Sequence, residues 1–206
     1  MLGRLKELTE INGVSGDEGQ VRRYIKNIVS QYADEVWTDA MGNLYAHKKG
    51  AKRRIMACAH MDEVGMMVRG IRDDGLIAYS AAGIDPRVVP SKRVVVGKDK
   101  VPGVIGSKAI HLQSRDEFGK AYKHKELYID IGAKDKADAQ KYVKLGDYIS
   151  FVTEFSEFGD GLIKAKALDD RAGCAIVMEL LKNSYDCDFY GVFTVQEELG
   201  LRGART

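Results

Sequence analysis

Apolar residues near the N-terminus recur at helical spacing. Leucines and an isoleucine at every third position of residues 2–11 predict a first helix. After a glycine-rich break, Ser15 and Glu18 have the S-x-x-E spacing of a capping box. An apolar stripe over residues 21–32 follows at i, i+3, i+4 and i+7, and it predicts a second, amphipathic helix.

Two later segments are short, continuous apolar runs. Residues 55–59 end at His60, and residues 189–195 end at Gln196. A run without polar alternation is typical of a strand buried on both faces of an α/β sheet. A hairpin predicted over residues 36–46 and a helical stripe over residues 172–181 complete this pattern. The two ends of the chain therefore predict one α/β domain.

The middle of the chain has a different pattern. Short β-rich runs alternate there with Gly, Pro and Asp turns, and only residues 136–143 have a helical pattern. This predicts a β-rich insertion, barrel-like or sandwich-like. The expected organisation is an α/β domain over residues 1–68, the insertion over residues 69–160, and the α/β domain continued over residues 161–206.

Composition and charge narrow the function classes. The 206 residues include 32 Lys and Arg against 30 Asp and Glu, and the net charge of +2 suggests neither a nucleic acid nor a membrane surface as partner. No window approaches the roughly 18 apolar residues of a membrane span. Three widely spaced cysteines give no disulfide framework, and the charged N-terminus is not a signal peptide. A cytoplasmic protein is expected.

Three polar clusters carry candidate chemistry: His60-x-Asp62, Asp169-Asp170 and Glu197-Glu198. Two follow predicted strands and one opens a predicted helix, and ligands of open α/β sheets bind beyond the carboxyl ends of the strands. One imidazole with several carboxylates suits Zn²⁺, Co²⁺ or Mn²⁺. A carboxylate can also bridge two metal ions, and a neighbouring carboxylate can act as general base.

Each cluster has a structural alternative when it is taken alone. Asp169-Asp170 is also what a helix N-cap with a first-turn acid looks like, and Glu197-Glu198 is also compatible with a solvated strand end. A single His-x-Asp pair is a weak signal for metal. The occurrence of all three clusters at the ends of buried elements of the same α/β domain favours a shared site, because clustering acids without compensation is costly.

The clusters lie within longer motifs that resemble the M42 family of metallo-aminopeptidases. These motifs are AHMDEVG at 59–65, ALDDRAG at 167–173 and VQEELGLRGA at 195–204. Shorter stretches are also similar to the family: GVSGDE at 13–18, DAMGNL at 39–44, GVIG at 103–106 and IDIGA at 129–133. The resemblance implies a three-layer dinuclear-metal peptidase domain, incomplete in this chain, with an inserted β-rich, barrel-like dimerisation domain.

The resemblance also assigns roles to individual residues. His60 would ligate one zinc or cobalt ion, Asp169 would bridge two ions, and Glu198 would ligate the other. Glu197 would be the general base, and Asp62 would orient His60. The implied activity is removal of N-terminal residues from peptides through a metal-bound hydroxide. The implied partners are a peptide substrate and further copies of the chain, from dimers up to dodecamers.

The resemblance implies two further ligands, an Asp and a His, downstream of the Glu197-Glu198 motif. The chain ends at Thr206, and none of His47, His111 and His124 lies in a matching motif. We therefore expect the N-terminal portion of an M42 enzyme, inactive by itself. The alternatives are a cellulase-like glycoside hydrolase, which needs paired carboxylates and no metal, and a non-catalytic assembly fragment.

Overall fold

The computed structural model describes all residues 1–206 and divides into two compact units. Residues 1–63 and 153–206 form the first, called the α/β unit below, and residues 64–152 form the second, the barrel unit. The predicted boundaries, after residues 68 and 160, fall later in the chain than these. The difference arises because β4 (Met66–Ile71) is already a barrel strand and β10 (Ser156–Phe158) already belongs to the α/β unit.

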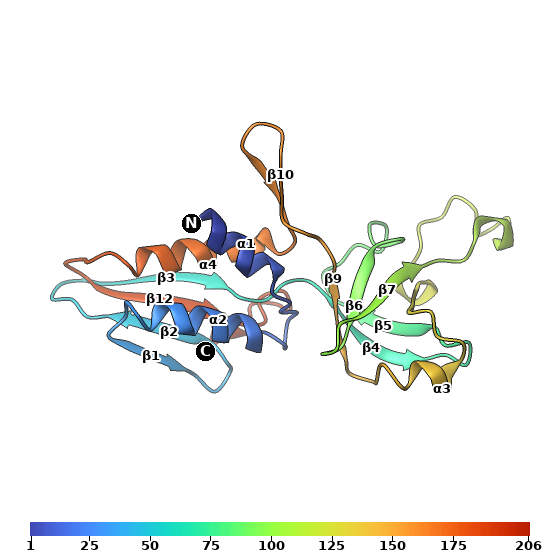
Figure 1. Ribbon diagram of the computed structural model, residues 1–206, viewed down its shortest axis with the longest axis horizontal. Helices are drawn as coiled ribbons and strands as arrows, with labels where there is room; N and C mark the ends of the chain where they lie inside the picture. The colour runs from blue at the N-terminus through green and yellow to red at the C-terminus, as the bar shows by residue number, and fades with distance from the viewer. The chain divides into compact units, whose positions relative to one another are not determined.

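The α/β unit is built on a four-stranded mixed sheet of order β1-β2-β12-β3 (Figure 1). β1 (Glu35–Thr38) and β2 (Leu44–Lys48) form the predicted antiparallel hairpin. β12 (Asp188–Thr194) pairs antiparallel with β2 and parallel with β3 (Arg54–His60). Because β3 and β12 are parallel, the carboxyl ends of these two apolar runs, which are distant in sequence, lie next to each other.

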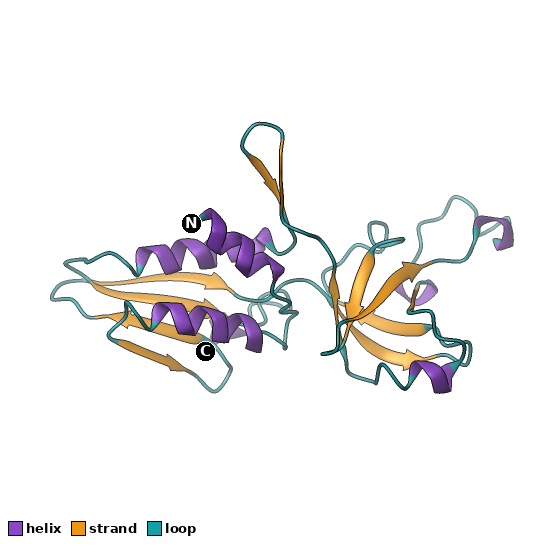
Figure 2. Ribbon diagram, in the orientation of Figure 1, coloured by secondary structure: helices purple, strands orange, loops and turns teal.

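Three helices pack on the sheet: α1 (Leu2–Glu10), α2 (Gly19–Val29) and α4 (Leu168–Leu180) (Figure 2). Their apolar stripes and one face of the sheet share a single core, whose largest buried members are Leu8, Ile25, Leu44, Met61, Met178 and Phe193. The predicted α/β class is confirmed. The helices form one layer and the sheet a second, which are two of the three predicted layers. A small hairpin of β10 and β11 (Leu162–Lys164) precedes α4.

The opposite face of the sheet carries aromatic and apolar side chains. Trp37 stacks on Tyr45 with ring centroids 5.1 Å apart, and His47 stacks on Tyr190 at 4.1 Å. On β3, Met56 is 57% exposed. The prediction that β3 is a central strand buried on both faces is wrong for this chain: only β12 flanks β3, the helices cover one face of the sheet, and Arg54, Ile55 and Met56 are exposed.

The capping box predicted at Ser15 and Glu18 does not form. Glu18 itself is the N-cap residue of α2 and gives the helix no side-chain cap. Ser15 Oγ donates instead to Asp62 at 2.6 Å, and Glu18 accepts from the backbone of Gly16 and Gln196. Both side chains are therefore used in tertiary contacts rather than in starting the helix.

The barrel unit is a closed barrel of six strands in the order β4-β5-β8-β7-β6-β9, which decides between the predicted barrel and sandwich. The remaining strands are β5 (Ile77–Ala81), β6 (Arg93–Val96), β7 (Val101–Gly106), β8 (Tyr128–Asp130) and β9 (Tyr148–Phe151). Their inward residues form a separate core with Val68, Ile77, Ile105, Ile129 and Ile149. The predicted helix at 136–143 is shorter, with α3 spanning Lys136–Ala139.

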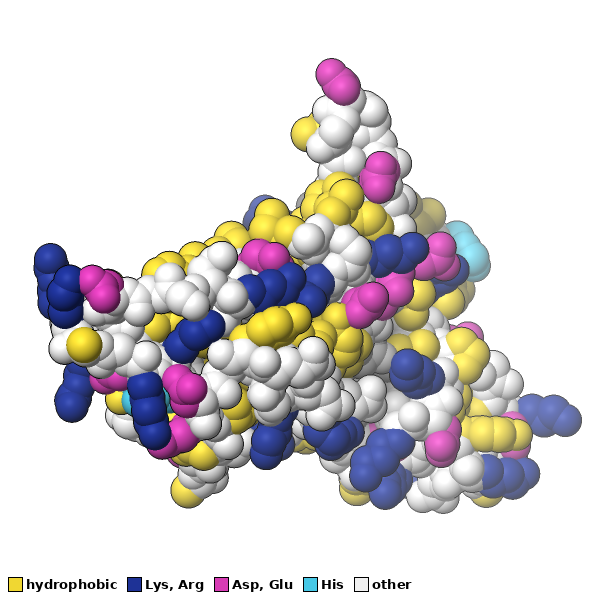
Figure 3. Space-filling view, turned by 60° about the vertical axis from the view of Figure 1, so that its left-hand side comes forward, with side chains coloured by type: hydrophobic (Ala, Val, Ile, Leu, Met, Phe, Trp, Pro, Cys, Tyr) yellow, Lys and Arg dark blue, Asp and Glu magenta, His cyan; other side chains and the backbone are white.

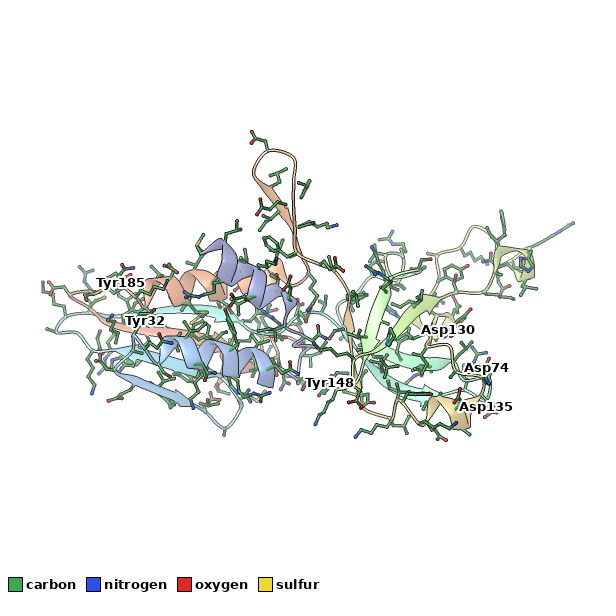
Figure 4. The ribbon with its side chains drawn as sticks, viewed as in Figure 1. Tyr32, Asp74, Asp130, Asp135, Tyr148 and Tyr185 are labelled. Carbon is green, nitrogen blue, oxygen red and sulfur yellow. The ribbon has the colours of Figure 1, made fainter.

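Acidic side chains in the barrel's turns bond nearby backbone (Figure 4). Asp135 caps α3 by accepting from Asp138 N, Asp130 accepts from Gly132 N, and Asp74 accepts from Leu76 N. The single-turn helices η1 (Ile110–Leu112) and η2 (His124–Glu126) lie between β7 and β8, and η3 (Gly203–Arg205) ends the α/β unit. These acids are explained by turn geometry and are not a site.

Surface charge agrees with the near-neutral composition. Lys and Arg are interspersed with Asp and Glu across the face shown in Figure 3. None of the helices combines the length and the apolar character needed to cross a bilayer.

Candidate metal centre

The three predicted polar clusters meet in the α/β unit. His60 is the last residue of β3, and Glu197 and Glu198 follow the end of β12. Because β3 and β12 are parallel neighbours, their carboxyl ends lie side by side. Asp169 is near the start of α4, which packs against β3. The topology thus brings side chains from three distant segments together at the carboxyl ends of the parallel strands, as expected for an open α/β sheet.

Three of these side chains have the geometry of a metal-ligand group. Ligand atoms of His60, Asp169 and Glu198 all lie within 4.8 Å of one another. His60 Nε2 is 3.1 Å from Asp169 Oδ1, and the side chain of Asp169 is 88% exposed. One imidazole nitrogen and two carboxylates form a donor set that suits Zn²⁺, Co²⁺ or Mn²⁺. The donors present therefore fit a divalent ion.

Asp62 lies behind this group and is fully buried. His60 Nδ1 is 3.1 Å from the backbone oxygen of Asp62 and 3.4 Å from its Oδ1, so the ring is held with Nε2 toward Asp169. The Asp62 carboxylate also accepts from Ser15 Oγ and from the backbone N–H groups of Glu197 and Glu198. Although burial opposes it, these donors and His60 lower the pKa of Asp62.

The acids around His60 shift its proton affinity. Burial alone would lower the pKa of His60, but the carboxylates of Asp62, Asp169 and Asp170 outweigh it and raise the pKa to about 9. Burial and the neighbouring carboxylates raise the pKa of Glu198. A positive charge at this place is therefore favoured, whether it is a proton on His60 or a cation between the carboxylates.

The two acids at 169 and 170 have different roles. Asp170 Oδ1 accepts from Gly173 N at 2.9 Å and its Oδ2 from His60 N at 3.3 Å, so Asp170 caps the regular part of α4 and ties it to β3. The capping alternative is therefore correct for Asp170. Asp169 faces His60 and belongs to the ligand group.

Comparison with known proteins identifies the relationship. The family model of the M42 glutamyl aminopeptidases matches residues 42–206. A curated relative from Acetivibrio thermocellus is 42% identical over 208 residues, covering 100% of this chain and 61% of its own length. The chain belongs to the M42 aminopeptidase family. It spans about three fifths of the length of the M42 relatives that it matches.

Solved structures give the same relationship. The TET aminopeptidase of a marine sediment Thaumarchaeota archaeon superposes with a TM-score of 0.95 at 36% identity, covering 100% of this chain and 61% of that one. The TET1 peptidase of Pyrococcus horikoshii, which assembles into a tetrahedron or an octahedral shell, gives 0.89 at 35%, covering 99% and 63%. A Thermotoga maritima structure titled as an endoglucanase gives 0.81 at 41%, covering 93% and 58%.

The sequence analysis of this M42 chain missed a buried ion cluster beside the site. Lys166 Nζ donates to both Glu63 oxygens at 2.6 and 2.8 Å, and Arg171 Nη2 is 3.8 Å from Glu63 Oε1. All three side chains are less than a tenth exposed. Arg171 also donates to the backbone of Met61, between His60 and Asp62. The available signal was a charged residue directly after two of the polar clusters: Glu63 after His60-x-Asp62, and Arg171 after Asp169-Asp170.

Proposed function

We propose that this chain carries part of the catalytic centre of a metal-dependent aminopeptidase. The observation that supports the proposal most is the convergence of His60, Asp169 and Glu198 within 4.8 Å, with Glu197 beside them. Membership of the M42 family supports the class of reaction. The substrate would be a peptide with a free N-terminus.

In this proposal His60, Asp169 and Glu198 would hold divalent ions, zinc or cobalt, and Asp169 would be the ligand shared between two of them. Such ions would polarise the scissile carbonyl and make water a stronger nucleophile. Glu197, whose Oε2 is 3.9 Å from His60 Nε2, would take the proton of the attacking water and pass it to the leaving amine. Asp62 keeps the His60 ring in position.

We further propose that this chain is inactive by itself. The site offers three donors, where two ions need more. Two observations support a need for further polypeptide. Trp37 and Met56 are exposed on an open face of the sheet, and the chain spans only 61% of the length of an M42 relative. The barrel unit would serve dimerisation, and assembly as in the TET1 peptidase would follow. The cytoplasm is the proposed compartment.

Metal binding tests the first part of the proposal. Titration calorimetry of this chain with Co²⁺ or Zn²⁺ should detect at most one loosely held ion. His60→Ala and Glu198→Gln should remove it, because they delete donors, whereas Glu197→Gln should keep it. Two tightly held ions per chain after dialysis against dilute chelator would contradict this expectation, and so would an ion that survives both donor substitutions.

Turnover tests the roles of the two neighbouring glutamates. In a full-length M42 enzyme carrying this sequence, Glu197→Gln should lower kcat by on the order of 10²–10⁴ with metal retained, since glutamine cannot accept the water proton. Glu198→Gln should weaken metal retention instead. The reverse pattern would mean that the roles are exchanged. Hydrolysis of leucyl- or glutamyl-p-nitroanilide by the 206-residue chain with cobalt would overturn the proposed inactivity.

The structure titled as an endoglucanase gives no support to the glycoside hydrolase alternative, because it is 41% identical to this M42 chain and belongs with the aminopeptidases. Glycosidases work with two carboxylates across the bond and need no histidine-containing metal group, and the donors around His60 favour the peptidase. Hydrolysis of carboxymethylcellulose that a chelator does not inhibit would support the glycosidase. If neither substrate is turned over at full length and no metal is retained, the non-catalytic assembly role is left.

A further inference from the structure

The segment that carries Glu197 and Glu198 lies beyond the last strand of the sheet. β12 ends at Thr194, so the N–H groups of residues 195–198 have no neighbouring strand to bond. Buried N–H groups without acceptors are costly, and this segment must find acceptors elsewhere. Gln196 also has a φ of +52°, a left-handed conformation that is uncommon for a residue with a side chain.

Side chains from three separate places accept all four N–H groups in succession. Val195 N donates to Asn43 Oδ1 at 3.0 Å, and Gln196 N donates to Glu18 Oε1 at 3.0 Å. Glu197 N and Glu198 N donate to the two carboxylate oxygens of Asp62 at 3.0 and 3.1 Å. The three acceptor residues are nearly or fully buried, at 4% exposure or less.

Glu18 and Asn43 are themselves fixed by other bonds. Glu18 Oε1 also accepts from Gly16 N at 2.8 Å, which holds the carboxylate in the loop before α2. Asn43 Nδ2 donates to Asp39 Oδ2 at 2.8 Å and to the backbone oxygen of Gly203 at 2.9 Å. These two acceptors thus link the 195–198 segment to the loop before α2 and to the turn between β1 and β2.

We propose that Glu18 and Asn43 are positioning residues, which together with Asp62 hold the backbone of residues 195–198 so that Glu197 and Glu198 point at the site. Neither touches the ligand group; both act through the main chain next to it. The inference rests on the proposed function for what is positioned, but the bonds that carry it are those of the chain alone. Glu18 is thereby explained as a long-range acceptor, although its sequence position suggested a cap.

Amide hydrogen exchange resolved to single residues tests this inference on the 206-residue chain without metal. In Glu18→Ala, exchange of the Gln196 amide should be faster by about tenfold or more, the scale of one lost buried hydrogen bond. The amides of β2 and β12 should keep their wild-type rates. In Glu18→Gln the Gln196 amide should return toward the wild-type rate, because an amide oxygen still accepts. Asp17→Asn, an exposed neighbour, is the matched control and should change nothing.

Three outcomes would overturn the inference: an unchanged rate at Gln196 in Glu18→Ala, an equal acceleration in β2 and β12, which indicates general destabilisation, or no rescue by Glu18→Gln. Asn43→Ala gives a second test and should accelerate Val195 most. If the exchange results hold but a full-length M42 enzyme carrying this sequence neither retains metal nor hydrolyses a peptide substrate, the proposed function fails and the positioning of the backbone stands.

Discussion

The barrel unit and the α/β unit use their polar side chains in different ways. Many acids of the barrel bond residues two or three positions away, as Asp85 does with Arg87 and Asp135 with Asp138. In the α/β unit, acids beside the candidate site also bond across the chain: Glu63 with Lys166, and Asp62 with Glu197. Short-range bonds shape turns, whereas the long-range bonds in this molecule build a site.

The two sheets also differ in whether their strands come from one stretch of the chain or from two. The barrel closes on itself within one contiguous stretch of chain, so every strand has two neighbours. The sheet of the α/β unit joins two separate stretches of chain and leaves β1 and β3 as edge strands, each with one neighbour. One face of this sheet carries exposed aromatic side chains such as Trp37. The comparison teaches that the self-contained unit is the one without candidate chemistry, and that the site depends on contacts distant in sequence.

The largest expected effect concerns the buried ion cluster. Glu63→Gln leaves Lys166 and Arg171 buried without their counter-charge and should lower the free energy of unfolding of the α/β unit by about 3–5 kcal/mol. Urea denaturation followed by Trp37 fluorescence measures this, because the only tryptophan lies in β1. Asp85→Asn, which breaks an exposed ion pair in the barrel, should leave the Trp37 transition in place. Equal shifts from both variants would erase the contrast between the units.

A core truncation in the barrel tests whether the units are energetically separate. Ile129 is fully buried in the barrel core, and Ile129→Ala should cost the barrel about 2–5 kcal/mol. Exchange of the barrel amides should accelerate, while the Trp37 transition keeps its midpoint. If the Trp37 transition moves by the same free energy, the two units unfold together and the division into independent units is wrong.

A smaller effect is expected at the start of α4. A Cβ added at Gly173 would lie 2.3 Å from Asp170 Oδ1, so Gly173→Ala must displace the capping carboxylate and should cost about 1–3 kcal/mol in thermal or urea unfolding. The matched control is Gly3→Ala in α1, where nothing lies within 4 Å and alanine favours the helix. A Gly173→Ala variant as stable as Gly3→Ala would show that the capping position of the Asp170 carboxylate does not contribute to stability.

The sequence predicted that most of the barrel unit is β-rich, because short β-rich runs alternate there with Gly, Pro and Asp turns, but it assigned the start of β4 to the α/β domain. It predicted the hairpin at Glu35–Lys48 and the three helices of the α/β unit for the same reason, since periodicity is local. It was wrong about β3, because a continuous apolar run does not reveal whether strands flank it on both sides or whether other elements cover both of its faces. It was wrong about Ser15 and Glu18, because a capping spacing cannot exclude partners that lie 47 and 178 residues away in the chain.

The sequence by itself determined the family resemblance, the alternation of α/β and β-rich segments, and the residues of the candidate ligand group, since these depend on residue identity and short spacing. Only the tertiary structure decided that His60, Asp169 and Glu198 meet, that Asp170 caps a helix, and that Glu18 and Asn43 accept from residues 195–198. The physical reason is that parallel pairing of β3 with β12 places the ends of two distant segments side by side, and no local pattern encodes which segments will pair.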